Sequence, residues 1–219
     1  AGSDRGLDLI RPGLGRGHKL DMVSDTFSLF AFAELLTELY VLEKARIVVP
    51  PPKQSSTLLP YFQTDHLGLL GSACDRASRN KLQVHWLARK LMQWLEVKAD
   101  VRQAKGAVPQ GTFVLRDESS LAQQAALGSF GFSSEGLGIT SGNPLSLIQA
   151  SENTAEAQML SQWFDQQWAQ LEEHPEAKTL LLSAVKDLAS HRDAASVYAL
   201  VLHQLFATEE LDEEKIVKS

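Results

Sequence analysis

The spacing of apolar residues along the chain predicts alternating strands and helices. Residues 19–27 have strand character, and residues 28–40 then carry apolar side chains three or four positions apart, as on one face of a helix. A short β-branched run at 46–49 is ended by three prolines, which cannot donate to a sheet ladder. This order is a β-α-β unit, and such a crossover favours a parallel sheet.

The rest of the chain continues the alternation. Asn153 and Glu156 are spaced as a capping box, which predicts that a helix begins there and buries one apolar side. A tail rich in carboxylates occupies 208–214. The other expected elements are a loop at 53–63, helix in two pieces from 64 to about 98, strands at 99–103, 111–116, 125–127 and 146–150, and amphipathic helices at 178–191 and 194–206.

Composition fits a folded protein with a sizeable core. The chain has 219 residues, 44% of them hydrophobic, enough for one large domain or one and a half small ones. Its single cysteine, Cys74, excludes an internal disulfide framework and suits a reducing cytoplasm, where we expect the protein to be. No apolar run approaches the roughly 18 residues of a membrane span, so no membrane partner is expected. Without an initiator Met, the chain is expected to be a piece of a longer protein.

Charge is distributed unevenly. A net charge of −6 opposes non-specific nucleic-acid binding by the chain as a whole. Residues 76–105, however, hold eight Lys or Arg against two Asp or Glu. This block fits a solvated helical face, which is the commoner case, or a basic surface that contacts phosphate. The residues proposed for that surface are Arg76, Arg79, Lys81, Arg89, Lys90, Arg102 and Lys105.

A basic and aromatic run at 85–90 has two interpretations. His85, Trp86, Arg89 and Lys90 together could form a nucleic-acid platform. A tryptophan in an amphipathic helix is more often part of the core, which is the favoured interpretation.

One stretch has the frame of a catalytic motif without its reactive side chains. Gln110, Thr112 and Asp117 are spaced like the histidine, lysine and aspartate of H-x-K-x4-D. Gly128-Ser129 and Gly131 then follow like a G-S-x-N sequence whose asparagine has become glycine. On these residues alone, an ordinary hairpin of an α/β domain fits as well.

This frame resembles the active-site motif of phospholipase D. The resemblance implies a histidine that attacks phosphorus, with lysine and asparagine stabilising the phosphoryl oxygens. Gln110 is no phosphorus nucleophile, and Thr112 would need a neighbouring base. None of the six histidines is followed by a lysine two residues later. We therefore expect no catalysis by this route, and Gln110, Thr112, Asp117 and Ser129 to line a vestigial pocket.

Further landmarks resemble the N-terminal region of large bacterial superfamily-two helicases, Swi/Snf-like or DEAD-box-like, found with restriction and phage-defence genes. They are the segments 20–27, 30–35, 87–95, 132–138 and 162–165.

The resemblance implies an α/β fold, a phospholipase D-like mixed sheet flanked by helices with a C-terminal helical extension. Its expected parts are a lead-in segment at 1–18 without regular structure, the phospholipase D-like domain at 19–174, and a helical linker at 175–219 toward an absent motor. The motor's nucleotide-binding signatures do not occur, so ATP and Mg²⁺ are expected only in that missing part, and no cofactor or metal in this one.

Three functions follow from the sequence. The first is a non-catalytic accessory domain that positions DNA for a helicase or translocase motor in cis. The second is a protein-interaction or dimerisation domain, because active single-copy relatives pair their motifs across a homodimer. The third is residual phosphodiesterase or nuclease activity.

Overall fold

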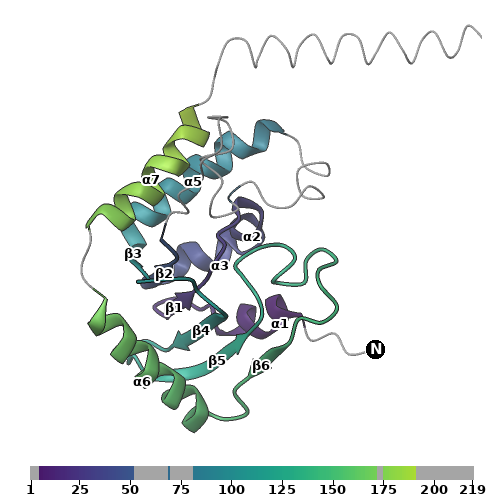
Figure 1. Cartoon of the computed structure of the whole chain (residues 1–219), viewed down its shortest axis with the longest axis vertical. Coiled ribbons are helices and arrows are strands. Elements are labelled where there is room, and N and C mark those ends of the chain that lie inside the picture. The colour runs from purple at the N-terminus through teal and green to yellow at the C-terminus, as the bar shows by residue number, and fades with distance from the viewer. Residues whose placement is uncertain (1–4, 52–68, 70–80, 172–174, 191–219) are drawn as a thin grey trace, which may run out of the picture. The chain divides into compact units, whose positions relative to one another are not determined.

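A computed structural model of the chain describes residues 5–51, 69, 81–171 and 175–190. Its strands are β1 (Lys19–Val23), β2 (Lys44–Val49), β3 (Ala99–Gln103), β4 (Gly111–Arg116), β5 (Ala122–Gly128) and β6 (Ile148–Ala150). They form one six-stranded sheet in the order β3-β2-β1-β4-β5-β6 (Figure 1). The first three strands are parallel, and β4, β5 and β6 each pair antiparallel with the strand before them in that order. The predicted mixed α/β sheet is therefore confirmed.

Several strand predictions are confirmed in detail. β3 and β4 begin and end at the predicted residues, and β1 and β2 are parallel, as the β-α-β reading requires. β5 is longer than the predicted 125–127 because Ala122 and Gln124 before it and Gly128 after it also pair with β4. The expected helix at 64–80 and the helix at 194–206 lie outside the described residues.

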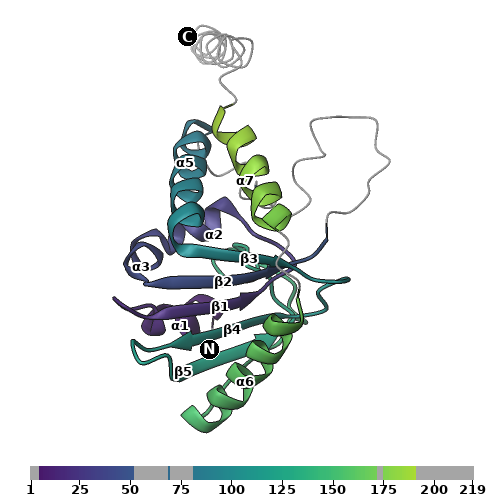
Figure 2. The ribbon, with the colours of Figure 1, turned by 90° about the vertical axis from the view of Figure 1, so that its left-hand side faces the viewer.

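Helices cover both faces of the sheet (Figure 2). One face carries α6, and the opposite face carries α1, α2, α3 and α5. The helices are α1 (Gly6–Ile10), α2 (Leu29–Glu34), α3 (Leu36–Val41), α5 (Lys81–Lys98), α6 (Thr154–Gln170) and α7 (Pro175–Ser190), with a 3-10 turn η1 (Arg11–Gly13) after α1.

The main core lies under α2, α3 and α5. Alternate strand residues point to this side, among them Leu20, Ile47 and Phe113, all at most 1% exposed. Trp94 of α5 is buried with them, and its Nε1 donates to the Leu39 carbonyl at 2.8 Å. Each such large side chain contributes roughly 1.5–3 kcal/mol by leaving water. The apolar stripe predicted for α5 is thus confirmed as core.

Trp86 corrects the favoured interpretation of the 85–90 run. Its side chain is 46% exposed, whereas Trp94 on the same helix is buried. Lys90 Nζ lies 5.9 Å from the Trp86 ring centroid and 5.8 Å from that of Tyr40. The difference arises because Trp86 lies off the Leu87–Leu91–Trp94 stripe that faces the core.

The helix expected over 28–40 is broken in two. Ser28 caps α2 by accepting a hydrogen bond from Phe30 N at 3.2 Å, and α2 ends at Glu34. Leu35 then leaves helical geometry with φ −109° and ψ 15°, and α3 begins after it. Leu35 is completely buried, so the break turns its side chain into the core.

The lead-in segment is ordered where no regular structure was expected. α1 and η1 occupy Gly6–Gly13, and Leu7, Ile10 and Leu14 are buried in the main core. Leu7 N donates to the Leu137 carbonyl at 3.0 Å. Three widely spaced apolar residues were enough to attach a glycine-rich segment to the sheet layer.

Helix α7 belongs to the same compact unit as the sheet. Lys178 Nζ donates to the Ala99 carbonyl at 2.7 Å, and Leu181 and Val185 are buried in the main core. This compact unit runs to Ala189, so the domain boundary expected at residue 175 lies inside it. In the described part of the chain, no helix is both long and apolar enough to cross a membrane.

Candidate functional site

Three residues of the motif frame, Gln110, Ser129 and Gly131, line a cleft at the ends of strands β4 and β5. Because β4 runs antiparallel to β1 and β5, its first residue, Gly111, pairs with Gly128, the last residue of β5. This topology brings Gln110, Ser129 and Gly131 together with the loop after β1. The resulting hollow, here named the motif cleft, has a volume of about 330 Å³. Its lining also includes Asp25, Thr26, Val108, Pro109, Phe130, Ser133, Glu135, Gly136, Asn143 and Ser146.

Gly128 is required by close backbone approach. A Cβ at this position would overlap the Leu147 carbonyl oxygen, a backbone atom that cannot rotate away. Ser129 N donates to the same carbonyl at 3.0 Å. The Gly-Ser pair of the motif therefore joins β5 to the segment before β6.

The loop after β1 fills the space beside Gly131, the position at which the resemblance would place an asparagine. A Cβ on the buried Gly131 would overlap Thr26 Oγ1 and lie 2.6 Å from Asp25 Oδ1. The two loops are held together, because Ser24 Oγ accepts from Phe132 N at 2.8 Å. Any side chain at 131 would require Thr26 and Asp25 to move.

Thr112 does not join Gln110 in the motif cleft. It lies within β4, 1% exposed, paired with Val23 on one side and Leu127 on the other. Its Oγ1 is buried, and no hydrogen-bond partner for it occurs among the described residues. Gln110 precedes the strand, is exposed and lines the cleft. Position 112, at which the resemblance would place a lysine, thus carries a buried hydroxyl.

Asp117 lies at the other end of β4, about six strand residues or roughly 20 Å from Gln110. Its carboxylate accepts from Leu121 N at 3.0 Å and from Gln123 Nε2 at 2.7 Å. These bonds close the β4–β5 hairpin. Asp117 therefore organises the turn and does not line the cleft.

The charge of the motif cleft does not suit phosphate. Of the described residues that line it, two are carboxylates, Asp25 and Glu135, and none is Lys or Arg. Both are exposed. An anion entering this cleft would meet negative charge without a compensating cation.

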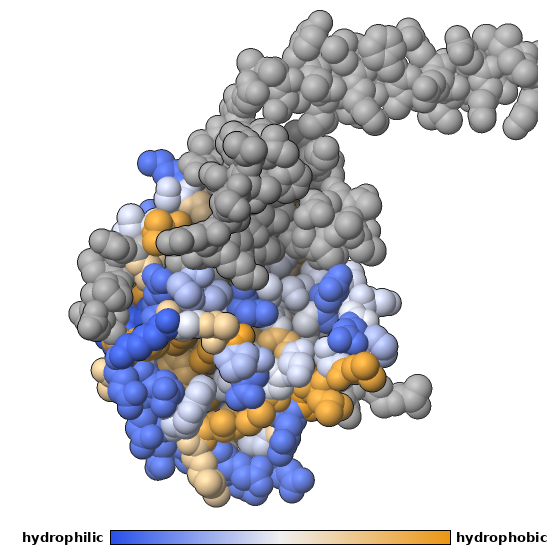
Figure 3. Space-filling model, viewed as in Figure 1, coloured by the Kyte–Doolittle hydropathy of each residue, from blue (hydrophilic) through white to orange (hydrophobic). Residues whose placement is uncertain are grey.

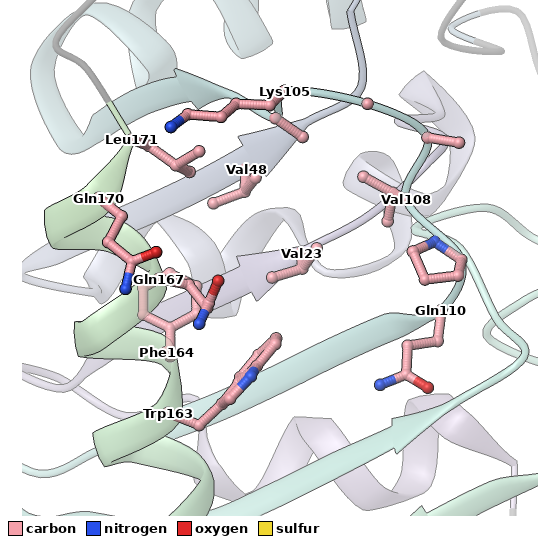
Figure 4. Close-up of a pocket in the computed structure, with 14 residues that line it drawn as sticks. Val23, Val48, Lys105, Val108, Gln110, Trp163, Phe164, Gln167, Gln170 and Leu171 are labelled. Atoms are coloured by element: carbon pink, nitrogen blue, oxygen red, sulfur yellow. The ribbon is translucent and has the colours of Figure 1, made fainter.

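A second cleft lies beside the first, between α6 and the sheet, and is here named the α6 cleft. Its volume is about 300 Å³, and Val108, Pro109 and Gln110 line both clefts. Val23, Val48 and Phe164 supply apolar surface, and Lys105 lies at one end (Figure 4). The remaining lining residues are Ala104, Gly106, Ala107, Trp163, Gln167, Gln170 and Leu171. In the space-filling view, hydrophobic surface lies next to a mostly hydrophilic α6 (Figure 3).

An ionic network that runs from the buried Asp21 to the half-exposed Asp165 fixes α6 on this face. Asp21 of β1, 2% exposed, accepts from Arg46 Nε and Arg116 Nε, each at 2.6 Å. Asp165 of α6 accepts from the Nη2 atoms of the same two arginines at 2.7 and 2.8 Å. Burial acts to lower the pKa of Arg46, but its hydrogen bonds and charge interactions with Asp21 and Asp165 outweigh burial and raise that pKa. Arg46 therefore stays charged, and both arginines are paired with the two carboxylates.

Sequence reasoning missed this network. Its signal was a charged residue between apolar neighbours in the strand interior, at 21 in β1 and 46 in β2, with 116 ending β4. In a sheet covered on both faces, such residues must find partners.

The proposed basic surface does not form one patch within the described residues. Arg76 and Arg79 lie outside them, as does the side chain of Lys81. Arg89 and Lys90 belong to α5, on the face opposite α6. Lys105 lines the α6 cleft.

Arg102 has a role in packing. Its guanidinium donates to the Leu171 carbonyl at 2.9 Å and also to the Trp168 carbonyl, and lies 4.5 Å from the Trp168 ring centroid. It thereby satisfies carbonyls at the end of α6. Arg102 was expected to face nucleic acid, but its guanidinium instead binds the C-terminal end of α6.

In comparisons with known proteins, no family model and no curated protein matches the chain. No group of three or more potential metal ligands occurs in the described ranges.

Proposed function

We propose that this chain is a non-catalytic accessory domain that positions DNA for an ATP-dependent helicase or translocase motor. The observation that carries the proposal is the convergence of Gln110, Ser129 and Gly131 on one open cleft, with no histidine among the described residues that line it. These three residues belong to the phospholipase D-like motif frame that the sequence resembles. The reactive side chains of that frame are absent: position 110 carries an amide, position 112 carries a buried hydroxyl, and the space beside Gly131 is occupied by Thr26 and Asp25.

The distribution of charge directs DNA away from the motif cleft. Asp25 and Glu135 would repel the phosphate backbone there, whereas the neighbouring α6 cleft has Lys105 and no carboxylate in its lining. Arg89 and Lys90 offer cations on the other face. DNA would therefore cross the edge of the sheet at the α6 cleft.

Salt-dependent binding of labelled single- and double-stranded DNA to the whole chain tests this function. If Lys105 and its neighbours contact phosphate, the logarithm of affinity should fall linearly with the logarithm of salt concentration. Lys105→Gln should reduce the slope by about one phosphate contact. Absence of binding at low salt would overturn the proposal.

A second candidate is self-association through the β6 edge. Leu145 and Leu147, just before this edge strand, are 84% and 78% exposed. A second copy of the chain could cover both leucines and pair with the open edge of the sheet. Sedimentation should then show a dimer that Leu147→Lys converts to monomer. A monomer at all concentrations would exclude this candidate.

A further inference from the structure

We infer that the α6 cleft is a binding site for one base of a single-stranded DNA, a site distinct from the vestigial motif. This inference rests on the proposed function and specifies how the DNA is held. It begins from the side chains that surround the cleft (Figure 4).

An aromatic surface is available for stacking. Trp163 is 37% exposed, although Phe164 beside it in the chain is buried. Its indole projects into the cleft from α6, toward the side on which Gln110 lies (Figure 4). Stacking on an aromatic ring is how proteins bind single-stranded bases without requiring a particular sequence.

Amide groups lie around the same space. Gln110 comes from the loop before β4, and Gln167 and Gln170 come from α6. Each amide has both donors and acceptors, the complement of the mixed donor and acceptor edge of a base. All three residues are exposed, so a ligand can reach them.

The charge around the cleft suits a nucleotide rather than a cation. Among the described residues that line it, Lys105 alone is charged. The nearby carboxylate of Asp165 on α6 is engaged by Arg46 and Arg116. A phosphate next to the bound base could therefore approach Lys105. With a volume of about 300 Å³ the cleft is at the small end of ligand sites, which suits one base and not a longer segment.

The test compares a single-stranded oligonucleotide with an abasic strand of the same length and phosphate number. The whole chain should bind the strand with bases about tenfold more tightly, the size expected of one stacked base. Trp163→Ala should abolish this preference and leave the salt dependence unchanged, whereas Trp163→Phe should keep part of it.

Two matched controls separate the cleft from the rest of the surface. Trp86→Ala removes an exposed tryptophan of α5, and Gln166→Ala removes a glutamine next to Gln167 that does not line the cleft. Both should retain the preference, whereas Gln167→Ala should change the ranking of the four bases. Thermal unfolding of each variant verifies that the fold is intact.

The outcomes distinguish the two proposals. Equal, salt-dependent binding of both strands, or an unchanged preference in Trp163→Ala, would overturn the base site and leave the DNA-positioning function standing. No binding of either strand at low salt would overturn both.

Discussion

Asp21 and Asp165 share the same two arginines, each carboxylate accepting hydrogen bonds from both Arg46 and Arg116. The four side chains come from three adjacent strands and from α6. Because two positive and two negative charges alternate, each charge has neighbours of opposite sign. On this face, α6 is joined to the sheet by this ionic network together with a small apolar cluster of Val114, Ala122, Ala125 and Ala157, in contrast to the larger apolar core under α5.

Replacing Asp21 with Asn should strongly destabilise the fold. The change leaves two guanidinium groups with less compensating charge at a site where Asp21 is 2% exposed. We expect a loss of about 3 kcal/mol in the free energy of unfolding, measured by urea denaturation. Asp8→Asn, which breaks the exposed Arg5–Asp8 pair, is the control and should change stability little. Equal losses in the free energy of unfolding from the two variants would show that the ionic network around Asp21 stabilises the fold no more than an exposed ion pair does.

Thr112→Val should stabilise the protein. Valine has nearly the shape of threonine, and it removes the buried Oγ1 for which the described residues supply no partner. The expected gain is about 1 kcal/mol in the free energy of unfolding. Ser24→Ala is the opposite case, because Ser24 Oγ accepts from Phe132 N and donates to the Thr26 carbonyl, and it should destabilise. A destabilised Thr112→Val would mean that the hydroxyl is hydrogen-bonded.

Because Thr26 occupies the space beside Gly131, we predict an energetic coupling between the loop after β1 and the loop after β5. Gly131→Ala should cost about 1–3 kcal/mol, because its Cβ would overlap Thr26 Oγ1. In a Thr26→Ala background the same change should cost less, and a double-mutant cycle measures the difference. Additive effects would contradict the steric account. Restoring the motif with His at 110, Lys at 112 and Asn at 131 therefore requires a smaller residue at 26 as well.

Tyr40 should make stability depend on alkaline pH. Burial raises the pKa of its phenol above the ordinary value of 10.0, because the phenolate would be poorly hydrated. The stabilisation from the neutral form is complete below the unfolded pKa and is lost as pH rises through the folded one. At neutral pH, Tyr40→Phe should cost about 1 kcal/mol, since the hydroxyl donates to the Lys90 carbonyl at 2.9 Å.

The measurement is the difference in unfolding free energy between wild type and Tyr40→Phe from pH 8 to pH 11. That difference should shrink as pH rises, because phenylalanine does not titrate. A difference that stays constant would show that the phenol ionises equally well in the folded and unfolded chain.

Local patterns predicted the elements that depend on neighbouring residues. β4 has sharp boundaries because Pro109 precedes its apolar run and Asp117 follows it, and Asn153 caps α6 as expected by accepting from Glu156 N at 3.0 Å. Glu156 reaches back to Glu152 N, one residue earlier than a standard capping box. The break at Leu35 was not predictable, because apolar spacing continues through it.

The candidate site depended on contacts that spacing cannot reveal. The motif frame correctly grouped Gln110, Ser129 and Gly131, since a strand pair brings them to one edge. It placed Asp117 in the same pocket, although the length of β4 separates them. Trp163 drew no attention as a ligand contact, because its exposure depends on how α6 is rotated against the sheet.

The shared arginines also bear on the order in which the protein is made. Arg46 and Asp165 are 119 residues apart, so a ribosome adding about 5–20 residues per second needs on the order of ten seconds to supply the second carboxylate. During that interval the strands can already be paired while the face that α6 will cover is still in water. Because that face carries Asp21, Arg46 and Arg116 beside its valines and alanines, the nascent sheet presents hydrated ions that interrupt an apolar surface, and an unbroken apolar surface would invite aggregation.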